Sequence, residues 1–244
     1  MKALVYEAPE QIRYNDIPEP TQAEGETHVR IMASGICGSD MHAYHGHDSR
    51  RIPPLVLGHE ATGEALTGRY AGKRVALNPL ITCGICDYCQ RNLSNLCPNR
   101  TMHGMNRQGF YAEIVSIPDQ NIIPLPESIS MTHAALMEPA GCTWRALQLA
   151  KRVSNRPLKD SHVLSLGAGA IGVLTSLMLE NAGCKQILTG DTSALRRESA
   201  TRALSSEVFN PIEKTFQNTF DLVIDAVGSP QSIFAVTYAV APGG

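Results

Sequence analysis

Four cysteines within fifteen residues constrain this chain more than any other feature of its sequence. They are Cys83, Cys86, Cys89 and Cys97. Four thiolates at this spacing can fill all four positions of a tetrahedral zinc ion, which leaves none open for a substrate. Disulfides or unrelated free thiols are the alternatives, but pairing within so short a loop would be strained. The spacing therefore predicts a structural zinc lobe and places the chemistry elsewhere in the chain.

Composition and charge narrow the class of protein. The chain has 244 residues, of which 43% are hydrophobic, so it can bury a core as one large domain or two modest ones. Its formal charge is −2 and no block of Lys and Arg stands out, which argues against a nucleic-acid or membrane-surface partner. Glu7 comes too early for a signal peptide, and no apolar run is long enough to span a membrane. With four of the seven cysteines at metal spacing, we expect a cytoplasmic protein.

A second set of potential metal ligands lies upstream of the cysteine cluster. Cys37 follows an alternating strand pattern over residues 29–33, and His59 and Glu60 follow a short apolar strand at residues 55–57. A thiol, an imidazole and a carboxylate form the mixed ligand set of a catalytic zinc ion, which keeps one position open. Either segment alone is weak, because a single Cys or His is usually an ordinary core or surface residue. Their occurrence beside a four-cysteine lobe favours a catalytic metal site.

The pattern of the chain changes at the loop over residues 155–157. Before it, short strands dominate, and Ser130 is expected to cap a helix over residues 131–137 that Glu138 and Pro139 end. On pattern alone, Glu138 is a solvated helix-terminal residue. A second helix is expected over residues 143–152. After the loop, strands and helices alternate as in a parallel sheet, so we expect domains at 1–152 and 153–244.

A glycine-rich loop opens the second domain. The sequence Gly-Ala-Gly-Ala-Ile-Gly over residues 167–172 follows a predicted strand at 162–166 and opens a predicted helix, and Asp191 comes nineteen residues after its last Gly. This is the full context of a dinucleotide site, where the glycines let a pyrophosphate approach the N–H groups of a helix N-terminus. Asp191 would bind the adenosine ribose hydroxyls and repel a 2′-phosphate, which favours NAD over NADP.

Two arginines follow closely after Asp191. Arg196 or Arg197 could bind a 2′-phosphate, although a solvated helix face is the simpler interpretation. The candidate cofactor residues are Gly167, Gly169, Ile171, Gly172, Asp191 and Arg196.

Taken together, these motifs resemble the zinc-dependent medium-chain alcohol dehydrogenases, and most closely the branch of sorbitol, threonine and sugar-acid dehydrogenases. The resemblance covers residues 35–228 in the family's order. It rests on Gly35-Ile-Cys37-Gly-Ser39-Asp40 with His42, Gly58-His59-Glu60, the four-cysteine lobe, Glu138-Pro139, and the 167–172 loop with Asp191. The implied fold is α/β with two domains, a GroES-like β-rich catalytic domain followed by a Rossmann domain with a doubly wound parallel sheet.

The resemblance also implies roles for the matching residues. Cys37 and His59 would bind the catalytic zinc, and Glu60 would bind it or stand just behind it. Glu138 would be a ligand or would hold the metal-bound water, which replaces the interpretation from pattern alone. Ser39 and His42 match the family's proton-relay positions. The structural zinc ligands would be Cys83, Cys86, Cys89 and Cys97.

No role carries over to the remaining cysteines or to several histidines. Cys142 and Cys184 are expected to be buried thiols. The histidines without an assigned role are His45, His47, His103 and His133.

The implied reaction is the oxidation of a secondary alcohol, such as a polyol, a sugar acid or an amino-acid alcohol. It would use two zinc ions per chain and NAD as the hydride acceptor. The catalytic zinc would act as a Lewis acid on the alcohol oxygen, and the proton would leave through Ser39, a ribose hydroxyl and His42. A complete chain of this family would form a homodimer or homotetramer.

The last residue, Gly244, follows four of the six strands expected of a doubly wound sheet. We therefore expect an incomplete Rossmann domain, in a fragment of a longer enzyme or in a truncated, inactive remnant that binds zinc and nucleotide. A related reductase or quinone oxidoreductase without catalytic zinc is a third interpretation. The presence of Cys37, His59 and Glu138 argues against it.

Overall fold

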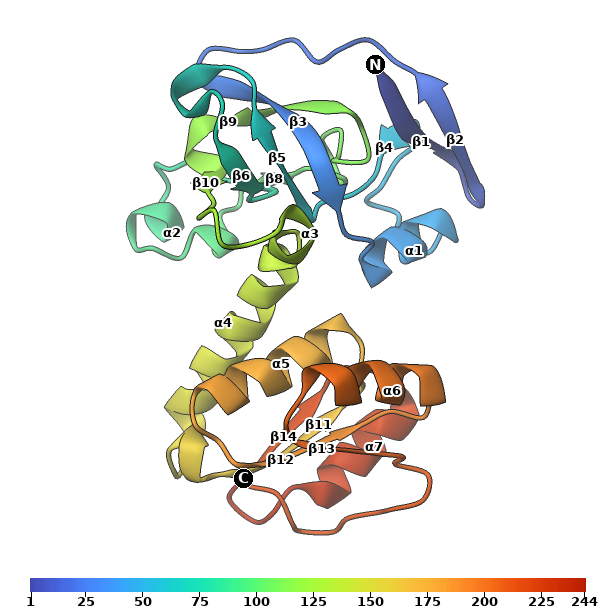
Figure 1. Ribbon diagram of the computed structural model, residues 1–244, viewed down its shortest axis with the longest axis vertical. Helices are drawn as coiled ribbons and strands as arrows, with labels where there is room; N and C mark the ends of the chain where they lie inside the picture. Colours follow the sequence, from blue (N-terminus) through green and yellow to red (C-terminus); the bar gives the residue numbers. More distant parts are fainter. The chain divides into compact units, whose positions relative to one another are not determined.

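The computed structural model describes all residues 1–244, which divide into two compact units, Met1–Glu138 and Pro139–Gly244. Figure 1 labels the elements of both units. Helix α4 (Met137–Val153) begins at the point of division. The predicted domain boundary, after residue 152, falls near the C-terminal end of this helix.

The first unit is built from antiparallel β-structure. Its main sheet has the strand order β10-β6-β5-β3-β9, beside a three-stranded sheet β2-β1-β4 and a two-stranded sheet β7-β8. The strands are β1 (Lys2–Ala8), β2 (Gln11–Asp16), β3 (Glu26–Ser34), β4 (Leu55–Val56), β5 (Ala61–Ala65), β6 (Arg74–Leu77), β7 (Leu80–Ile81), β8 (Thr101–Met102), β9 (Ile114–Pro118) and β10 (Ile122–Pro124).

Alternation along these strands places one apolar face of the main sheet in the core. Val29 of β3, Val75 of β6 and Ile117 of β9 are fully buried there, together with Phe110. Short helices fill the connections. They are α1 (Gly38–Tyr44), η1 (Gly68–Tyr70), α2 (Asp87–Gln90), η2 (Ser94–Leu96), η3 (Asp119–Asn121) and α3 (Met131–Ala134).

The second unit has a four-stranded parallel sheet in the order β13-β12-β11-β14. Its chain starts in the middle of the sheet, adds two strands on one side and then crosses to the other, as in a nucleotide-binding doubly wound fold. The elements are η4 (Leu158–Asp160), β11 (His162–Leu166), α5 (Ala170–Asn181), β12 (Gln186–Gly190), α6 (Ala194–Ala203), β13 (Glu207–Phe209), β14 (Leu222–Asp225) and α7 (Pro230–Ala239).

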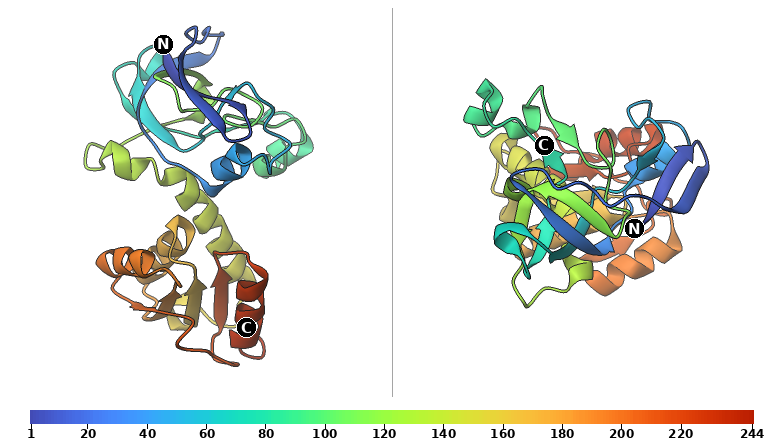
Figure 2. Two further views of the ribbon diagram at one scale, coloured as in Figure 1. Left: turned by 90° about the vertical axis from the view of Figure 1, so that its right-hand side faces the viewer. Right: turned by 90° about the horizontal axis from the view of Figure 1, so that it is seen from above.

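Helices cover both faces of this sheet. Val163 of β11 packs with Leu147 of α4 and Leu179 of α5, whereas its neighbour Leu164 packs on the opposite face with Ala239 of α7. Figures 1 and 2 show α5 and α6 on one side of the sheet and α7 on the other. Because both faces are buried, consecutive residues of β11 from Val163 to Leu166 are all buried rather than alternately exposed.

The helix expected to end at Glu138-Pro139 is a wrong prediction. Ser130 does cap a helix through its hydroxyl, which accepts a hydrogen bond from the His133 N–H. That helix, α3, stops at Ala134, and Glu138 and Pro139 lie in the first turn of α4. Proline is tolerated there because the N–H groups of a first turn have no partner within the helix. The proline therefore starts a helix here instead of ending one.

Candidate functional site

The four clustered cysteines converge in a lobe of the first unit. Cys83 follows β7, Cys86 precedes α2, Cys89 lies within α2, and Cys97 follows η2. Their ligand atoms all lie within 4.8 Å of one another, and all four are free cysteines. Sulfur–sulfur distances are 3.5 Å for Cys86–Cys89 and Cys97–Cys83, and 4.0 Å for Cys83–Cys89. Zinc–sulfur bonds of about 2.3 Å in a tetrahedron would place sulfur atoms about 3.8 Å apart, so the lobe fits zinc rather than disulfides.

Electrostatics in this lobe favour binding of a cation. The backbone N–H groups of Ile85 and Cys86 lower the pKa of the Cys83 thiol to about 6. A backbone N–H of Cys89 also favours the Cys86 thiolate, but burial and the neighbouring sulfurs outweigh it and raise that pKa to about 11. One thiolate therefore disfavours the next, and a bound dication would relieve this repulsion.

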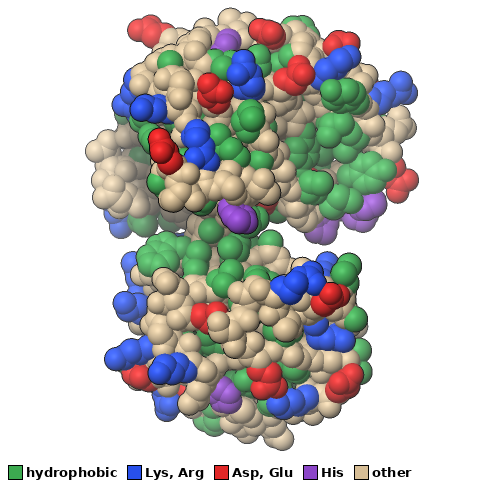
Figure 3. All heavy atoms as spheres, viewed as in Figure 1, with side chains coloured by type: hydrophobic (Ala, Val, Ile, Leu, Met, Phe, Trp, Pro, Cys, Tyr) green, Lys and Arg blue, Asp and Glu red, His purple; other side chains and the backbone are tan.

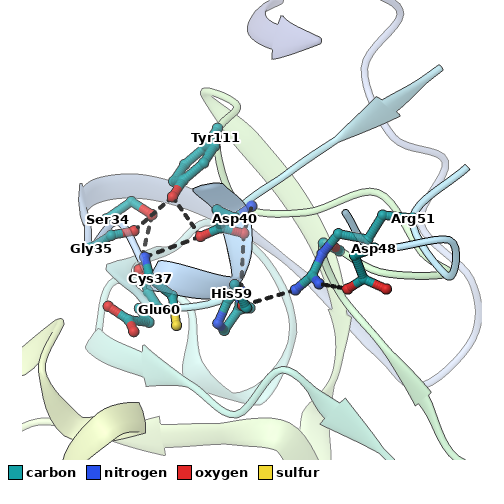
Figure 4. Close-up of polar contacts among 12 residues, drawn as sticks. Ser34, Gly35, Cys37, Asp40, Asp48, Arg51, His59, Glu60 and Tyr111 are labelled. Carbon is teal, nitrogen blue, oxygen red and sulfur yellow. Dashed lines mark hydrogen bonds and ion pairs between the residues drawn. The ribbon is translucent and has the colours of Figure 1, made fainter. Parts of the chain in front are cut away.

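A second group of potential ligands forms around helix α1. Cys37 is the N-cap residue of α1, and His59 and Glu60 lie between β4 and β5. The ligand atoms of the three side chains lie within 4.8 Å of one another. His59 and Glu60 are buried and Cys37 is partly buried. Figure 4 shows the Cys37 sulfur, the His59 ring and the Glu60 carboxylate turned toward one space, a donor set that suits zinc with an open position.

Asp40, three residues beyond Cys37 in the first turn of α1, organises this group. Its Oδ2 accepts hydrogen bonds from the Cys37 N–H at 3.1 Å and the Tyr111 hydroxyl at 2.8 Å. Its Oδ1 lies 3.3 Å from Nδ1 of His59 (Figure 4). Although burial opposes ionisation, these partners hold the pKa of Asp40 below its usual value. The contact directs Nδ1 of His59 to the carboxylate and leaves Nε2 for a metal ion.

The ionisation of the ligands reflects the same contacts. Burial would lower the pKa of His59, but Asp40 and Cys37 raise it to about 10. The pKa of the Cys37 thiol is lowered, chiefly by its hydrogen bond with His59. Asp40 and the Cys37 sulfur thus both favour a proton on His59. A metal ion in the same place would displace that proton and bind the thiolate directly.

Glu60 and Glu138 differ in their placement. Burial raises the pKa of Glu60, and the negative charge of Glu138 raises it further, so the two carboxylates lie within electrostatic reach. Glu138 nevertheless is not in the group whose ligand atoms lie within 4.8 Å. A Cβ at Gly35 would displace the Glu60 carboxylate from its present position.

The two residues predicted for proton relay, Ser39 and His42, lie on α1. Ser39 is partly buried and its Oγ accepts a hydrogen bond of 3.1 Å from Nη2 of Arg51. His42 is exposed, and its ring centroid lies 6.5 Å from that of His47. Residues three apart on a helix are neighbours on its surface, so the pair leads from the buried ligands toward solvent. Arg51 and Tyr111 were not predicted, because nothing in their local sequence indicates these contacts.

The second unit has a cavity beside the loop that follows β11. The loop after β11 has Gly167 at φ +97°, and a Cβ on Gly172 would lie 1.7 Å from the Gly167 carbonyl oxygen. A Cβ on Gly169 would meet no atom within 4 Å. The adjoining cavity of about 310 Å³ is lined by residues that include Gly167, Asp191, Arg196, Val227 and Ser229. Gly167 and Gly172 are thus needed for the close turn, whereas the loop faces open space at Gly169.

Asp191 is buried just after β12, and its carboxylate connects the loop after β11 to the turn before α6. It accepts hydrogen bonds of 2.8 Å from the N–H groups of Ala168 and Ser193. Arg196 is exposed, with Nη1 3.8 Å from Asp191 Oδ2, and Ile171 is exposed on α5. A carboxylate has lone pairs for about four hydrogen bonds, so Asp191 can bind the loop and still accept from a ligand.

The two cysteines without an assigned role have different environments. Cys184 is buried, as predicted, and its sulfur donates to the Ser161 carbonyl at 3.3 Å. Cys142 is exposed on α4, so the prediction of a buried thiol there is wrong. The helix face that carries Cys142 is not the face that Leu147 buries.

On the face shown in Figure 3, positively and negatively charged side chains are interspersed rather than gathered into a patch of one sign. None of the helices combines the length and apolar character that a membrane crossing needs.

Comparison with known proteins gives consistent matches across the chain. Residues 23–127 match the family model of the alcohol dehydrogenase GroES-like domain. An L-threonine 3-dehydrogenase of Pyrococcus horikoshii is 31% identical over 247 residues, covering 94% of this chain and 69% of that protein. The crystal structure of a zinc-binding dehydrogenase from Sinorhizobium meliloti bound to NADP superposes with a TM-score of 0.89 at 28% identity, covering 100% of this chain and 74% of that one. The RspB alcohol dehydrogenase of Escherichia coli, complexed with NADH, superposes with a TM-score of 0.86 at 28% identity, with the same coverage of 100% and 74%.

Proposed function

This chain belongs to the zinc-type medium-chain dehydrogenases, and on that premise we propose that it oxidises a secondary alcohol and transfers the hydride to NAD. One observation carries the proposal. Cys37, His59 and Glu60, from separate segments, place a thiol, an imidazole and a carboxylate within 4.8 Å of one another, beside the Ser39 hydroxyl. A structural zinc site has all four positions filled by protein ligands. Three different ligands with a fourth position open are instead typical of a catalytic zinc site.

Two zinc ions are proposed. Cys37, His59 and Glu60 would hold the catalytic ion, with Glu138 as a further ligand or as a hydrogen-bond acceptor for bound water. The four-cysteine lobe would hold the structural ion. When bound, the catalytic zinc supplies Lewis acidity to the alcohol oxygen, and the nicotinamide supplies the hydride acceptor.

The residues of the chain itself orient the ligands and move the proton. Asp40 fixes the ring of His59, and Tyr111 fixes Asp40 in turn. Ser39 would take the proton of the alcohol, and His42, exposed three residues further along α1, would release it to solvent. Removing the hydroxyl of Ser39 should therefore slow the reaction without emptying the metal site.

NAD is the proposed cofactor, and NADP the less favoured one. The loop at residues 167–172 would receive the pyrophosphate at the N-terminus of α5. Asp191 would accept from the ribose hydroxyls, and its negative charge would repel a 2′-phosphate. Arg196 lies close enough to offset that repulsion in part, which is why the two cofactors need direct comparison.

The proposed substrate is a small alcohol, such as a polyol, a sugar acid or an amino-acid alcohol. L-Threonine is a member of the last class, and the name of the Pyrococcus horikoshii relative supports its inclusion. We also propose a homodimer or homotetramer as the assembled form.

The test is an activity screen on the purified 244-residue chain after its zinc content has been measured. Reduction of NAD at 340 nm by L-threonine, sorbitol, galactitol 1-phosphate or a sugar acid is the expected result. Cys37→Ser should lose one zinc and all activity together, whereas Cys142→Ser should lose neither. Two bound zinc ions and NADH binding without turnover on any secondary alcohol would contradict the proposed reaction and leave a binding protein.

A further inference from the structure

Arg51 is the most deeply buried charged side chain beside the candidate catalytic site. Only 2% of its surface is exposed. Its guanidinium donates from Nε to the Gly104 carbonyl at 2.7 Å, from Nη1 to Asp48 Oδ2, and from Nη2 to Ser39 Oγ at 3.1 Å. Figure 4 shows Arg51 and Asp48 next to His59 and the N-terminal end of α1. A buried guanidinium is retained only when its donors are satisfied, and here one of them is aimed at a predicted catalytic hydroxyl.

The charge of Arg51 is balanced outside the catalytic group. Asp48, which is nearly buried, receives Arg51 on one side and Arg50 on the other, and these hydrogen bonds hold its pKa well below the usual range. Arg50 is largely exposed and contacts Asp48 only. The buried pair therefore does not depend on Asp40, His59 or a metal ion for its neutrality.

The hydrogen bond from Arg51 restricts what the Ser39 hydroxyl can do. A serine oxygen has two lone pairs and one proton. When Arg51 donates to one lone pair, the other lone pair can accept one hydrogen bond and the O–H can donate one. Arginine cannot be deprotonated in a protein, so this contact is always a donor to Ser39 and never competes for its proton.

We propose that Arg51 is a positioning residue, which fixes the rotation of the Ser39 hydroxyl so that its free lone pair and its proton serve the transfer from an alcohol. The proposal rests on the proposed dehydrogenase function. If Arg51 had only a structural role, it would hold residues 48–51 against the turn at Gly104 through its hydrogen bonds to Asp48 and Gly104, and the Ser39 hydroxyl would not matter. The two roles differ in whether the effect of changing Arg51 depends on the Ser39 hydroxyl.

The experiment is a double-mutant cycle on the zinc-loaded chain with Arg51→Met, Ser39→Ala and the double variant. Arg51→Met should lower kcat by about tenfold or more, within the range that positioned proton transfer contributes, while zinc content and KM for NAD stay unchanged. In the Ser39→Ala background the same change should alter kcat by less than about twofold, because coupled residues are not additive. Arg50→Met is the matched control, since it removes a neighbouring arginine from the same carboxylate without touching Ser39.

Crystal structures give a second readout that does not need activity. Arg51→Lys keeps a positive charge beside Asp48, so it should fold even if Arg51→Met does not. A lysine ammonium group is too compact to donate to all three acceptors of the planar guanidinium. Ser39 should then occupy more than one rotamer. An unchanged Ser39 rotamer, or equal losses from Arg51→Met with and without the Ser39 hydroxyl, would overturn the proposal. An inactive wild-type chain would contradict the proposed function alone, because the Ser39 rotamer in the two structures still decides the role of Arg51.

Discussion

The carboxylate of Asp40 lies 3.3 Å from Nδ1 of His59, and both side chains are almost completely buried. This relationship links the fold to the chemistry of the site. Asp40 also receives the N–H of Cys37 at the start of α1, so one carboxylate fixes two of the three potential zinc ligands. The protein's own groups therefore orient these two ligands.

Asp40→Asn should weaken zinc binding at the Cys37 group by about 10- to 100-fold, because an amide holds the His59 ring less firmly and no longer offsets the metal charge. Zinc per chain, measured after dialysis against a moderate chelator, should fall from two toward one. The zinc of the four-cysteine lobe should stay. Asp87→Asn, an exposed change within that lobe, is the control. Retention of both zinc ions in Asp40→Asn would show that Asp40 does not orient the ligand.

Cys83→Ser should destabilise the four-cysteine lobe before it affects chemistry. The lobe consists of short helices and turns with few buried side chains, so its order depends on the metal rather than on a core. We expect loss of one zinc and rapid proteolysis between residues 84 and 96, with a lower thermal midpoint, because losing a metal is among the most destabilising single changes. Cys142→Ser is the matched control. A protease-resistant Cys83→Ser chain would contradict the structural role.

Two glycines of the nucleotide loop should behave differently when changed to alanine. The Cβ of Gly172→Ala would overlap the Gly167 carbonyl oxygen at 1.7 Å, so the free energy of unfolding should fall by about 1–3 kcal/mol. The Cβ of Gly169→Ala meets no atom, and only the weaker N-cap preference of alanine acts against it, so the free energy of unfolding should fall by less than about 1 kcal/mol. NADH binding, followed by fluorescence, should nevertheless weaken in Gly169→Ala, because the methyl group points where the pyrophosphate approaches. Unchanged NADH affinity in Gly169→Ala would place the nucleotide elsewhere.

The sequence predicted much of the second unit because its signals are local. The strand at residues 162–166, the glycine loop and the helix that this loop opens are confirmed. The helix break at Pro139 was wrong because proline has opposite effects inside a helix and in its first turn. Only the preceding chain, which turns at residues 135–136, decides between them.

The candidate site was less accessible to local signals. Cys37 and His59 are twenty-two residues apart. Their ligand types and the neighbouring four-cysteine lobe suggested a common metal site, but only the resemblance to a family assigned their roles. Arg51 and Tyr111 contact the site through tertiary packing, from loops whose sequence carries no period or motif. Cys142 was expected to be buried because cysteine usually is, but the burial of a helix residue depends on which face packs. Local sequence patterns thus do not predict the contacts between segments that are distant in the chain.

A buried histidine away from both zinc sites makes stability depend on pH. His103 is 3% exposed and stacks on Phe110. Its Nδ1 lies 2.6 Å from the Gln108 carbonyl oxygen, to which it donates, and its buried Nε2 has no hydrogen-bond partner. Burial lowers the pKa of His103 below its ordinary value of 6.5, and nearby Arg107 lowers it further. A proton on Nε2 would add an unpaired buried N–H and a buried charge.

Stability should therefore fall as the pH drops below about 6.5, because the unfolded chain then binds a proton that folded His103 resists. Above that pH both states are neutral at this residue and the contribution is constant. The free energy of unfolding, from urea titrations between pH 7.5 and 5, should show a shallower decline in His103→Gln than in the wild type. His133→Gln, which removes an exposed imidazole, is the control and should follow the wild-type curve. Parallel curves for His103→Gln and the wild type would mean that another group controls the acid sensitivity.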